Sequence, residues 1–398
     1  MMVYIPLTVL TIALALLVGR ARAAVAGVSI HPAGRSITRQ TVVDRIALGS
    51  IFVALFLVSA LRLNVGNDYG NYVEFMHLAD VHAYVPTEWG FNNLTRFVYL
   101  ISGYENYLAV FAIFAAVTIA LFMAALYELS EDFTLSFIMF MLLGYYFQSL
   151  STVRYYLALA VAIYSMRFVL RRDWPRFVVT VCLGALFHRS LLLVLVMYPL
   201  AQLRWRRWMY AGVGMLCVLS LFIREELLEL VLRLYPTYAD TAYLSGGTSL
   251  VAIARCVLVI AAILFIYRGK KGGHLIRWDR LYNDRVLYMS LICNMLALLL
   301  YTFGSFLPTV SRIAYYLTVT QLLAVPALVC RIPVTETFFL GKNRNLRTAV
   351  KSVIVAGCLV YFVMYMRGAA GPGVRILPYQ TFLFHELPPM VSDRGGTP

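Results

Sequence analysis

The sequence predicts an all-α membrane protein, a polytopic bundle of about ten spanning helices plus one re-entrant or broken helical hairpin. Composition is the first indication: 61% of the 398 residues are hydrophobic and only 13% are charged, against roughly 45–50% and 25% in soluble domains. The second is a series of apolar runs along the whole chain, and the third is the separation of basic from acidic loops. We expect one transmembrane domain over 1–398 with no separate soluble enzyme domain.

The apolar runs place the predicted helices. Several of them are shorter than the roughly 20 residues that a straight span requires, so flanking residues or local thinning of the bilayer must complete them. The first run has no Lys or Arg before it and arginines after it, which favours an uncleaved helix over a signal peptide. The runs lie near 3–19, 46–61, 107–127, 133–150, 153–170, 177–203, 209–223, 250–267, 286–303, 313–330 and 352–366.

Loop charges predict the orientation, because cytoplasmic loops carry an excess of Lys and Arg. Loop 20–45 has five Arg and one Asp, whereas loop 62–106 has two Arg and five acidic residues. Loops 268–285 and 331–351 are again basic, and loop 224–249 is acidic. We therefore expect the three basic loops in the cytoplasm, and the N-terminus and both acidic loops outside.

One run does not fit a single crossing. Run 177–203 has arginine clusters on both sides, at Arg171, Arg172, Arg176, Arg204, Arg206 and Arg207. A hairpin that enters from the cytoplasm and turns near His188-Arg189-Ser190 keeps both clusters on one side. Polar backbone at membrane depth is tolerated where it is buried in protein or lines a wet cavity. The charge pattern therefore predicts a cavity near His188.

Two further segments are expected outside. In loop 62–106, apolar residues at helical spacing predict two short amphipathic helices on the membrane surface. They are Tyr72, Phe75, Met76 and Ala79, and then Phe91, Leu94, Phe97, Val98 and Ile101. The Pro- and Gly-rich tail 367–398 is expected to be largely irregular.

The composition also excludes classes of function. The formal net charge of +15 follows from the basic loops, and no nucleic-acid-binding motif accompanies it, so we expect no nucleic-acid partner. No phosphate-binding glycine loop, zinc motif or nucleophile elbow is present. Each of the six cysteines lies in or beside an apolar run, far from the others in sequence, so neither a metal nor another cofactor is expected.

Two arginines at helix openings are candidate ligands for an anion. Arg154 is followed by Tyr155-Tyr156 and Arg312 by Tyr315-Tyr316, and both should lie at the outer membrane face. A single interfacial arginine that snorkels beside aromatic residues is the plain alternative. A pair on one face is better suited to a lipid diphosphate, because guanidinium groups bind phosphate oxygens bidentately and keep their charge.

Two further residues are candidates for proton transfer. His188 is either a hydrogen-bonded packing residue or a general base, since neutral histidine can accept a proton near pH 7. Asp68 lies in Gly66-Asn67-Asp68-Tyr69, which is typical of a turn with a capping Asp at a helix start near Tyr72. Alternatively, its carboxylate binds a sugar hydroxyl or abstracts its proton.

These motifs, taken in order, resemble the EpsG-type, Wzy-like polysaccharide polymerases of bacterial inner membranes. The resemblance covers roughly 46–380. It departs from the family at Tyr155, where members commonly have Gln, and at Trp89, where they commonly have Pro. The matching elements are Arg62, Gly66-Asn67-Asp68-Tyr69, Tyr72, Glu88-Trp89-Gly90-Phe91-Asn92, Leu94, Arg154-Tyr155, Phe187-His188-Arg189-Ser190, Ser311-Arg312, Tyr315-Tyr316 and Leu377-Pro378-Tyr379.

The resemblance implies a metal-independent glycosyltransferase that joins undecaprenyl-diphosphate-linked oligosaccharide units on the outer face. The product would be O-antigen, capsule or exopolysaccharide, and a flippase and a chain-length regulator of the same pathway would be partners. A flippase for the same lipids and a membrane acyltransferase that modifies the glycan remain alternatives. We expect His188 and Asp68 to be catalytic, and substrate to be bound by Arg154, Arg312, Arg62, Arg189, Tyr69, Tyr155, Tyr315 and Tyr316.

Overall fold

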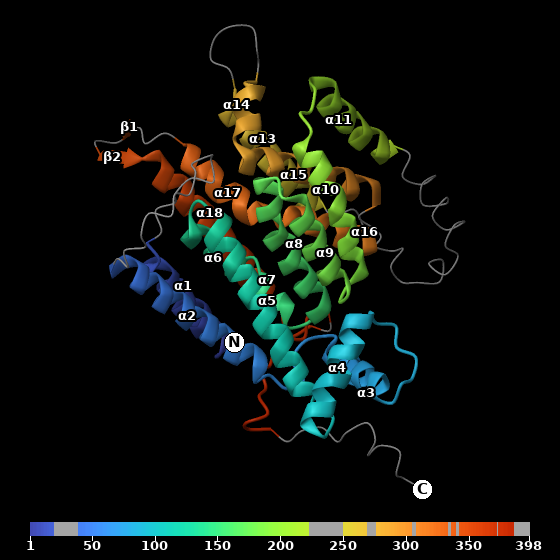
Figure 1. Ribbon diagram of the computed structural model, residues 1–398. Helices are drawn as coiled ribbons and strands as arrows, with labels where there is room; N and C mark the ends of the chain where they lie inside the picture. Colours follow the sequence, from blue (N-terminus) through green and yellow to red (C-terminus); the bar gives the residue numbers. More distant parts are fainter. Residues whose placement is uncertain are drawn as a thin grey trace.

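The protein is described from a computed structural model that covers residues 1–19, 39–222, 250–268, 276–304, 308–332, 336–339, 342–371 and 373–385. Helices make up nearly all of it, and they pack side by side in one bundle (Figure 1). A single short pair of antiparallel strands, β1 (Glu336–Phe339) and β2 (Lys342–Asn345), is the exception within these ranges. The predicted all-α class is confirmed for the bundle.

The first half of the chain supplies most of the helices around the candidate site, and α16 (Pro308–Thr318) of the second half supplies the rest. The helices of the first half are α1 (Tyr4–Leu17), α2 (Arg39–Ala60), α3 (Tyr69–Asp80), α4 (Trp89–Ser102), α5 (Tyr107–Leu129), α6 (Phe133–Leu142), α7 (Tyr145–Ser149), α8 (Val153–Arg171), α9 (Trp174–Ala185), the 3-10 helix η1 (Arg189–Val196) and α10 (Met197–Gln202).

The second half completes the bundle. Its helices are α11 (Arg207–Phe222), α13 (Leu250–Ile266), α14 (Trp278–Asn283), α15 (Arg285–Gly304), α16 (Pro308–Thr318), α17 (Gln321–Arg331) and α18 (Leu346–Gly368).

Six of the described helices are long and apolar enough to cross a membrane. They are α2, α5, α8, α15, the continuous segment Val310–Arg331 formed by α16 and α17, and α18. The remaining apolar helices have 10–17 residues, among them α1, α6, α9 and α13. The chain is therefore a membrane protein, but length and composition support six spans where about ten were predicted.

The bundle has two ends that differ in their contacts. At one end, which we call the α14 end, ion pairs tie the helices together: Arg331 contacts Glu131 and Asp284, and Lys351 contacts Asp132. The other end, which we call the α3–α4 end, carries the segment 62–106. That segment holds α3 and α4, and their place on a membrane surface stays a prediction.

The tail also reaches the α3–α4 end. Residues 373–385 form no helix, as expected, but backbone hydrogen bonds fix their position. The amide of Leu63 donates to the carbonyl of Gln380 at 2.9 Å, and that of Phe382 donates to the carbonyl of Leu61 at 3.3 Å. The Tyr4 hydroxyl donates to the Ile376 carbonyl at 3.0 Å, so the first helix meets the tail there as well.

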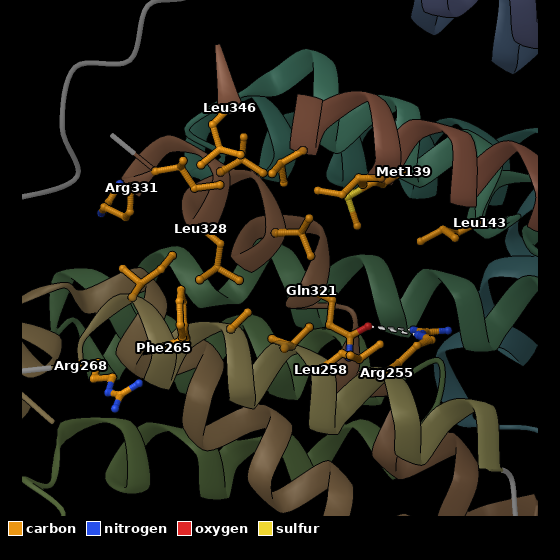
Figure 2. A pocket seen from close by; sticks show the side chains of 18 of the residues that line it. Met139, Leu143, Arg255, Leu258, Phe265, Arg268, Gln321, Leu328, Arg331 and Leu346 are labelled. Atoms are coloured by element: carbon orange, nitrogen blue, oxygen red, sulfur yellow. Dashed lines mark hydrogen bonds between the residues drawn. The ribbon is translucent and has the colours of Figure 1, made fainter. Parts of the chain in front are cut away.

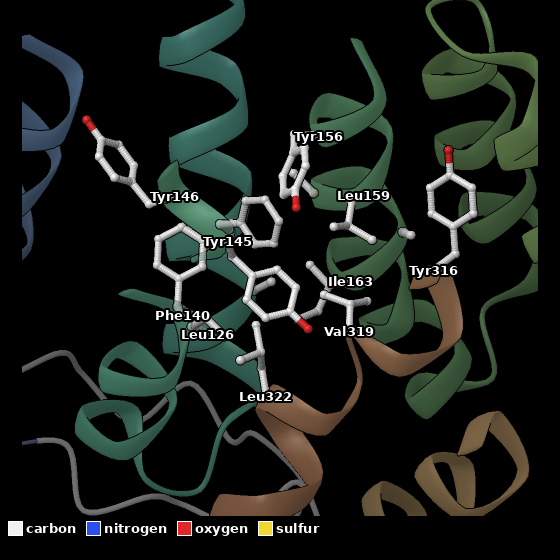
Figure 3. Close-up of a cluster of buried hydrophobic side chains, with 14 of the residues drawn as sticks. Leu126, Phe140, Tyr145, Tyr146, Tyr156, Leu159, Ile163, Tyr316, Val319 and Leu322 are labelled. Atoms are coloured by element: carbon white, nitrogen blue, oxygen red, sulfur yellow. The ribbon is translucent and has the colours of Figure 1, made fainter. Parts of the chain in front are cut away.

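Aromatic and aliphatic side chains fill the centre of the bundle around α8 (Figure 3). Tyr145 of α7 and Tyr156 of α8 are fully buried, together with Phe140 and Leu322. Because this filling is dense, α8 is held firmly, and Arg154 in its first turn has a fixed position at the α3–α4 end.

A break at 186–188 separates α9 from η1, and the two short helices pack against each other. Gly184 permits the close approach, because a Cβ at this position would lie 2.5 Å from Leu191 and 2.8 Å from Val161. The turn lies at His188, where a hairpin was predicted. Its re-entrant path through a membrane stays a prediction.

Candidate functional site

Charged and polar side chains from α4, α8, α16 and the 186–190 turn meet at the α3–α4 end. Their centre is Glu88, which directly precedes α4 and makes no side-chain cap hydrogen bond to it. The Glu88 carboxylate instead forms an ion pair with Arg154 and accepts the backbone N–H of Arg189 at 3.2 Å. One acidic side chain thus joins α8 to the hairpin turn.

Gly90 holds the same turn against α4. Its N–H donates to the Leu186 carbonyl at 2.8 Å, and a Cβ at Gly90 would lie 2.7 Å from that oxygen. Only glycine allows the two backbones to approach this closely. Gly90 therefore determines how near the turn that carries His188 lies to Glu88.

Arg154 is oriented by rings as well as by charge. Its guanidinium carbon lies 5.6 Å from the ring centre of Tyr72 and 5.4 Å from that of Phe91, both within the range of cation–π attraction. Its side chain is 17% exposed. The Nε atom is buried and has no hydrogen-bond partner among the described residues, so one donor of this guanidinium is unsatisfied.

His188 lies beside this ion pair. Its Nδ1 is 3.7 Å from a carboxylate oxygen of Glu88 and 3.2 Å from the Ser190 hydroxyl, which in turn lies 3.0 Å from the Tyr316 hydroxyl. Among the residues that the structure describes, none bonds to Nε2. The ring is thus held through one nitrogen, while the other is open to a ligand.

The surroundings of His188 keep the imidazole neutral. Burial lowers its pKa from 6.5 to about 4, and the positive charges of Arg154, Arg312 and Arg189 add to the effect, while Glu88 opposes it. Burial and nearby cations both disfavour the imidazolium. At pH 7 the ring is therefore neutral, and one of its nitrogens carries no proton, but the same effects make it a weaker base than a free imidazole.

Arg312 joins the cluster through Tyr155. The Tyr155 hydroxyl donates to the Arg312 carbonyl at 2.8 Å, and the Arg312 guanidinium carbon lies 6.0 Å from the Tyr155 ring centre. The Tyr155 ring also contacts those of His188, at 5.6 Å, and Tyr316, at 5.2 Å. The two arginine-tyrosine motifs, 158 positions apart in sequence, therefore meet at one end of the bundle.

Asp68 faces the same cations. It stands at the N-cap of α3, but its side chain makes no capping hydrogen bond. Burial raises the pKa of the Asp68 carboxyl, and the charges of Arg312 and Arg154 oppose this rise. The helix begins at Tyr69 rather than near Tyr72.

Three predicted site residues lie elsewhere. Arg62 is 2% exposed; it donates to the Ser59 carbonyl at 2.5 Å and lies 4.9 Å from the Phe111 ring centre. Tyr69 is buried against Phe111, with ring centres 4.7 Å apart. Both therefore belong to the packed layer beneath the cluster, where no ligand reaches them directly.

Tyr315 points away from its neighbour Tyr316. It stacks on Tyr145 with ring centres 5.3 Å apart and planes 12° from parallel. Adjacent helical residues differ by about 100° in direction, so only one tyrosine of each pair can face the cluster. For Arg312 that residue is Tyr316.

Sequence reasoning assigned no role to Glu88, Ser190 or Arg255. Glu88 stood only within a family motif, and no spacing rule links it to Arg154. Arg255 did carry a signal, since a lone arginine in the apolar run 250–267 is a functional candidate by its cost in lipid. It lies on α13, away from the cluster.

The described residues contain no group of three His, Cys, Asp or Glu side chains close enough to hold a metal ion. The chemistry that the cluster can supply is charge and proton transfer. Guanidinium groups can stabilise a departing anion, and one neutral imidazole can accept a proton.

Fold and site together define a helical membrane protein with a cationic, histidine-containing site at one end of its bundle. The chain belongs to the EpsG family: the sequence model of that family matches residues 45–381. Searches of curated proteins and of solved structures gave no match. The family suggests a polysaccharide-polymerase-like membrane protein.

Proposed function

We propose that the chain is a polymerase that joins undecaprenyl-diphosphate-linked oligosaccharide units at the outer face of a bacterial inner membrane. One observation carries the proposal: Arg154 and Arg312 both act on a histidine to whose Nε2 no described residue bonds. A diphosphate leaving group requires cations, and an attacking sugar hydroxyl requires a base. Both lie within one cluster.

In the proposed reaction, a hydroxyl of the incoming unit attacks the anomeric carbon of the growing chain. The bond from that carbon to the diphosphate oxygen breaks, and its electron pair leaves with the diphosphate. Arg154 and Arg312 stabilise the charge that develops, which is typically worth about 10²–10³ in rate per donor. The hydroxyl proton passes to His188 Nε2, with Asp68 as the substitute base. Direct displacement inverts the anomeric centre.

Glu88 has a positioning role in this scheme. Before substrate binds, it holds Arg154 and, through the Arg189 amide, the turn that carries His188. An incoming diphosphate then competes with Glu88 for Arg154. The exchange costs less than exposing a bare guanidinium, because the arginine is paired in both states.

The loop charges support placing the cluster outside. The basic loops 268–285 and 331–351 flank helices whose ends meet at the α14 end, and cytoplasmic loops carry the positive excess. The α3–α4 end would then face outward, where lipid-linked units are presented for polymerisation.

Purified protein with one defined undecaprenyl-diphosphate-linked unit provides the test. We expect a ladder of products at unit-length spacing and release of undecaprenyl diphosphate. In a deletion strain, single-unit glycans agree with a polymerase. Lipid-linked units trapped inside would indicate a flippase, and full-length chains without acyl groups an acyltransferase; either result refutes the proposal.

A further inference from the structure

A second site candidate is a cavity of about 1100 Å³ among α6, α13, α17 and α18 (Figure 2). Its wall is mostly apolar between the arginines at its two ends and includes Met139, Leu143, Leu258, Ala262, Leu328 and Ile354. Apolar space of this kind in a membrane protein fills with hydrocarbon. The composition of the wall alone does not select one lipid over another.

Arg255 gives the cavity a chemical preference. It lines the cavity from α13, and its Nε and Nη2 donate to the Gln321 amide oxygen at 3.2 and 3.0 Å. The Gln321 amide nitrogen donates onward to Asn294 at 2.7 Å. Both partners are neutral.

Within the described ranges, no Asp or Glu forms an ion pair with Arg255. A cation at this depth without a counter-charge is costly. An anionic headgroup beside Arg255 would offset that cost, so the cavity favours an amphiphile that brings an anion.

The two ends of the cavity indicate how the amphiphile lies. Figure 2 shows Arg255 and Gln321 at one end and Arg268 and Arg331 at the other. Arg255 and Arg268 are 13 positions apart, which corresponds to about 20 Å along a helix. Arg331 is already neutralised by acidic partners, and Arg268 and Arg277, which also line the cavity, are exposed at that end. Among the described arginines that line the cavity, Arg255 is therefore the one that lies inside the bundle without an ion pair.

We propose that this cavity binds a second polyprenyl diphosphate, with its diphosphate at Arg255 and its hydrocarbon chain running along the apolar wall toward the α14 end. A phospholipid with its headgroup at the α14 end would place its chain ends against the guanidinium, which is unfavourable. This inference rests on the proposed function, because a polymerase must hold two lipid carriers at once.

The Arg154 cluster and the Arg255 cavity are separate sites, as the donor and acceptor lipid carriers of a polymerase require. The donor loses its diphosphate at the Arg154 cluster. The diphosphate of the acceptor takes no part in bond breaking and must lie away from the reacting atoms. Arg312 and Gln321 lie on the single span Val310–Arg331, nine positions or about 14 Å apart. We therefore assign the cavity to the carrier of the acceptor.

Photolabelling of the full chain in nanodiscs tests the assignment. The probe is a sugar-free polyprenyl diphosphate with a diazirine at the far end of its chain, and labelled peptides are located by mass spectrometry. We expect label on α13 and α18. Arg255→Gln should reduce it about tenfold or more, and Ala262→Trp, which fills the cavity without touching the arginine, should do the same.

Matched controls make the result specific. Arg176→Gln removes a surface arginine whose side chain is 75% exposed and should leave the label unchanged. Arg154→Lys should lower turnover about tenfold or more while the label on α13 persists, so failure of the polymerase proposal and failure of this one are distinguishable. Label that survives Arg255→Gln and Ala262→Trp in folded protein would overturn the assignment. Equal displacement by phosphatidylglycerol would do so too, because it indicates generic lipid.

Discussion

Replacing His188 with Gln distinguishes a base from a packing residue. Gln keeps a hydrogen-bonding side chain toward Ser190 and Glu88 but cannot take up the proton of an attacking hydroxyl. Loss of a general base typically lowers the rate by about 10²–10⁴. We therefore expect His188→Gln to fold and bind substrate normally, yet to turn over at least about a hundredfold more slowly.

The surroundings of His188 set the pH dependence. Because burial lowers the pKa of His188 to about 4, nearly all molecules carry the neutral imidazole at pH 7. Since the neutral form is the active one, kcat/KM should be flat from pH 5 to 9 and should fall only below pH 5. A bound diphosphate brings negative charge among the three arginines, so it raises the pKa of His188. The fall in kcat at low pH should therefore begin at a higher pH than the fall in kcat/KM.

The assay is turnover of purified protein in nanodiscs across pH 4 to 9, with thermal unfolding recorded at each pH to exclude denaturation. In His188→Gln, neither kcat nor kcat/KM should fall at low pH. A fall caused by ionisation of the substrate would remain in this variant. Mutant turnover within about tenfold of wild type would remove His188 from the mechanism and transfer the base role to Asp68. If kcat/KM of the wild-type protein fell below about pH 6.5, the conclusion that burial and nearby arginines lower the pKa of His188 would be refuted.

Four further outcomes are expected. Arg154→Lys and Arg312→Lys should each lose about tenfold or more in turnover at normal membrane levels, because lysine keeps the charge but lacks the planar fork. Glu88→Gln should slow turnover yet make inorganic diphosphate a stronger inhibitor, since Arg154 is no longer shared. Gly90→Ala should destabilise the protein by about 1–3 kcal/mol in thermal unfolding, because its Cβ strikes the backbone of the hairpin turn. A thiol introduced as Asp279→Cys, at a side chain 81% exposed, should resist membrane-impermeant reagents in intact spheroplasts.

The arginine substitutions have a matched control, and each outcome has a contrary result. Arg171→Lys changes an arginine at the opposite end of α8 whose side chain is 51% exposed, and should keep full activity. Full polymer from both site variants would return Arg154 and Arg312 to the role of interfacial residues. Unchanged inhibition by diphosphate in Glu88→Gln would argue against competition for Arg154. Wild-type stability of Gly90→Ala would contradict the close approach, and labelling of Asp279→Cys from outside would invert the topology.

The membrane class and the meeting of the two arginine-tyrosine motifs were predictable, because both depend on hydrophobic periodicity and on which end of a helix a residue occupies. The break beside His188 was predictable for a related reason, because arginine clusters on both sides of one run argue against a single crossing. The re-entrant path itself stays a prediction. Hydrophobic periodicity, position at a helix end and clusters of arginine are local features that can be read from neighbouring residues in the sequence.

Long-range pairing was not predictable in the same way. Glu88 meets Arg154 across 66 positions through the packing of α4 on the hairpin, and no local pattern encodes that distance. Arg62 stood beside Arg154 in the family resemblance, yet it pairs with the tail and is packed into the core. Tyr315 and Tyr316 are adjacent in sequence, but rotation about the helix sends them to different surroundings.

The pairing of 61–63 with 380–382 has a consequence for how the protein is made. Membrane helices are delivered in order from the ribosome, so residues near Arg62 reach the bilayer more than 300 positions before the segment that pairs with them. Until that segment emerges, the residues near Arg62 stay uncovered at the α3–α4 end. A truncated product that lacks only this short tail would resemble an unfinished nascent chain and would be open to the proteases that clear such chains from the membrane.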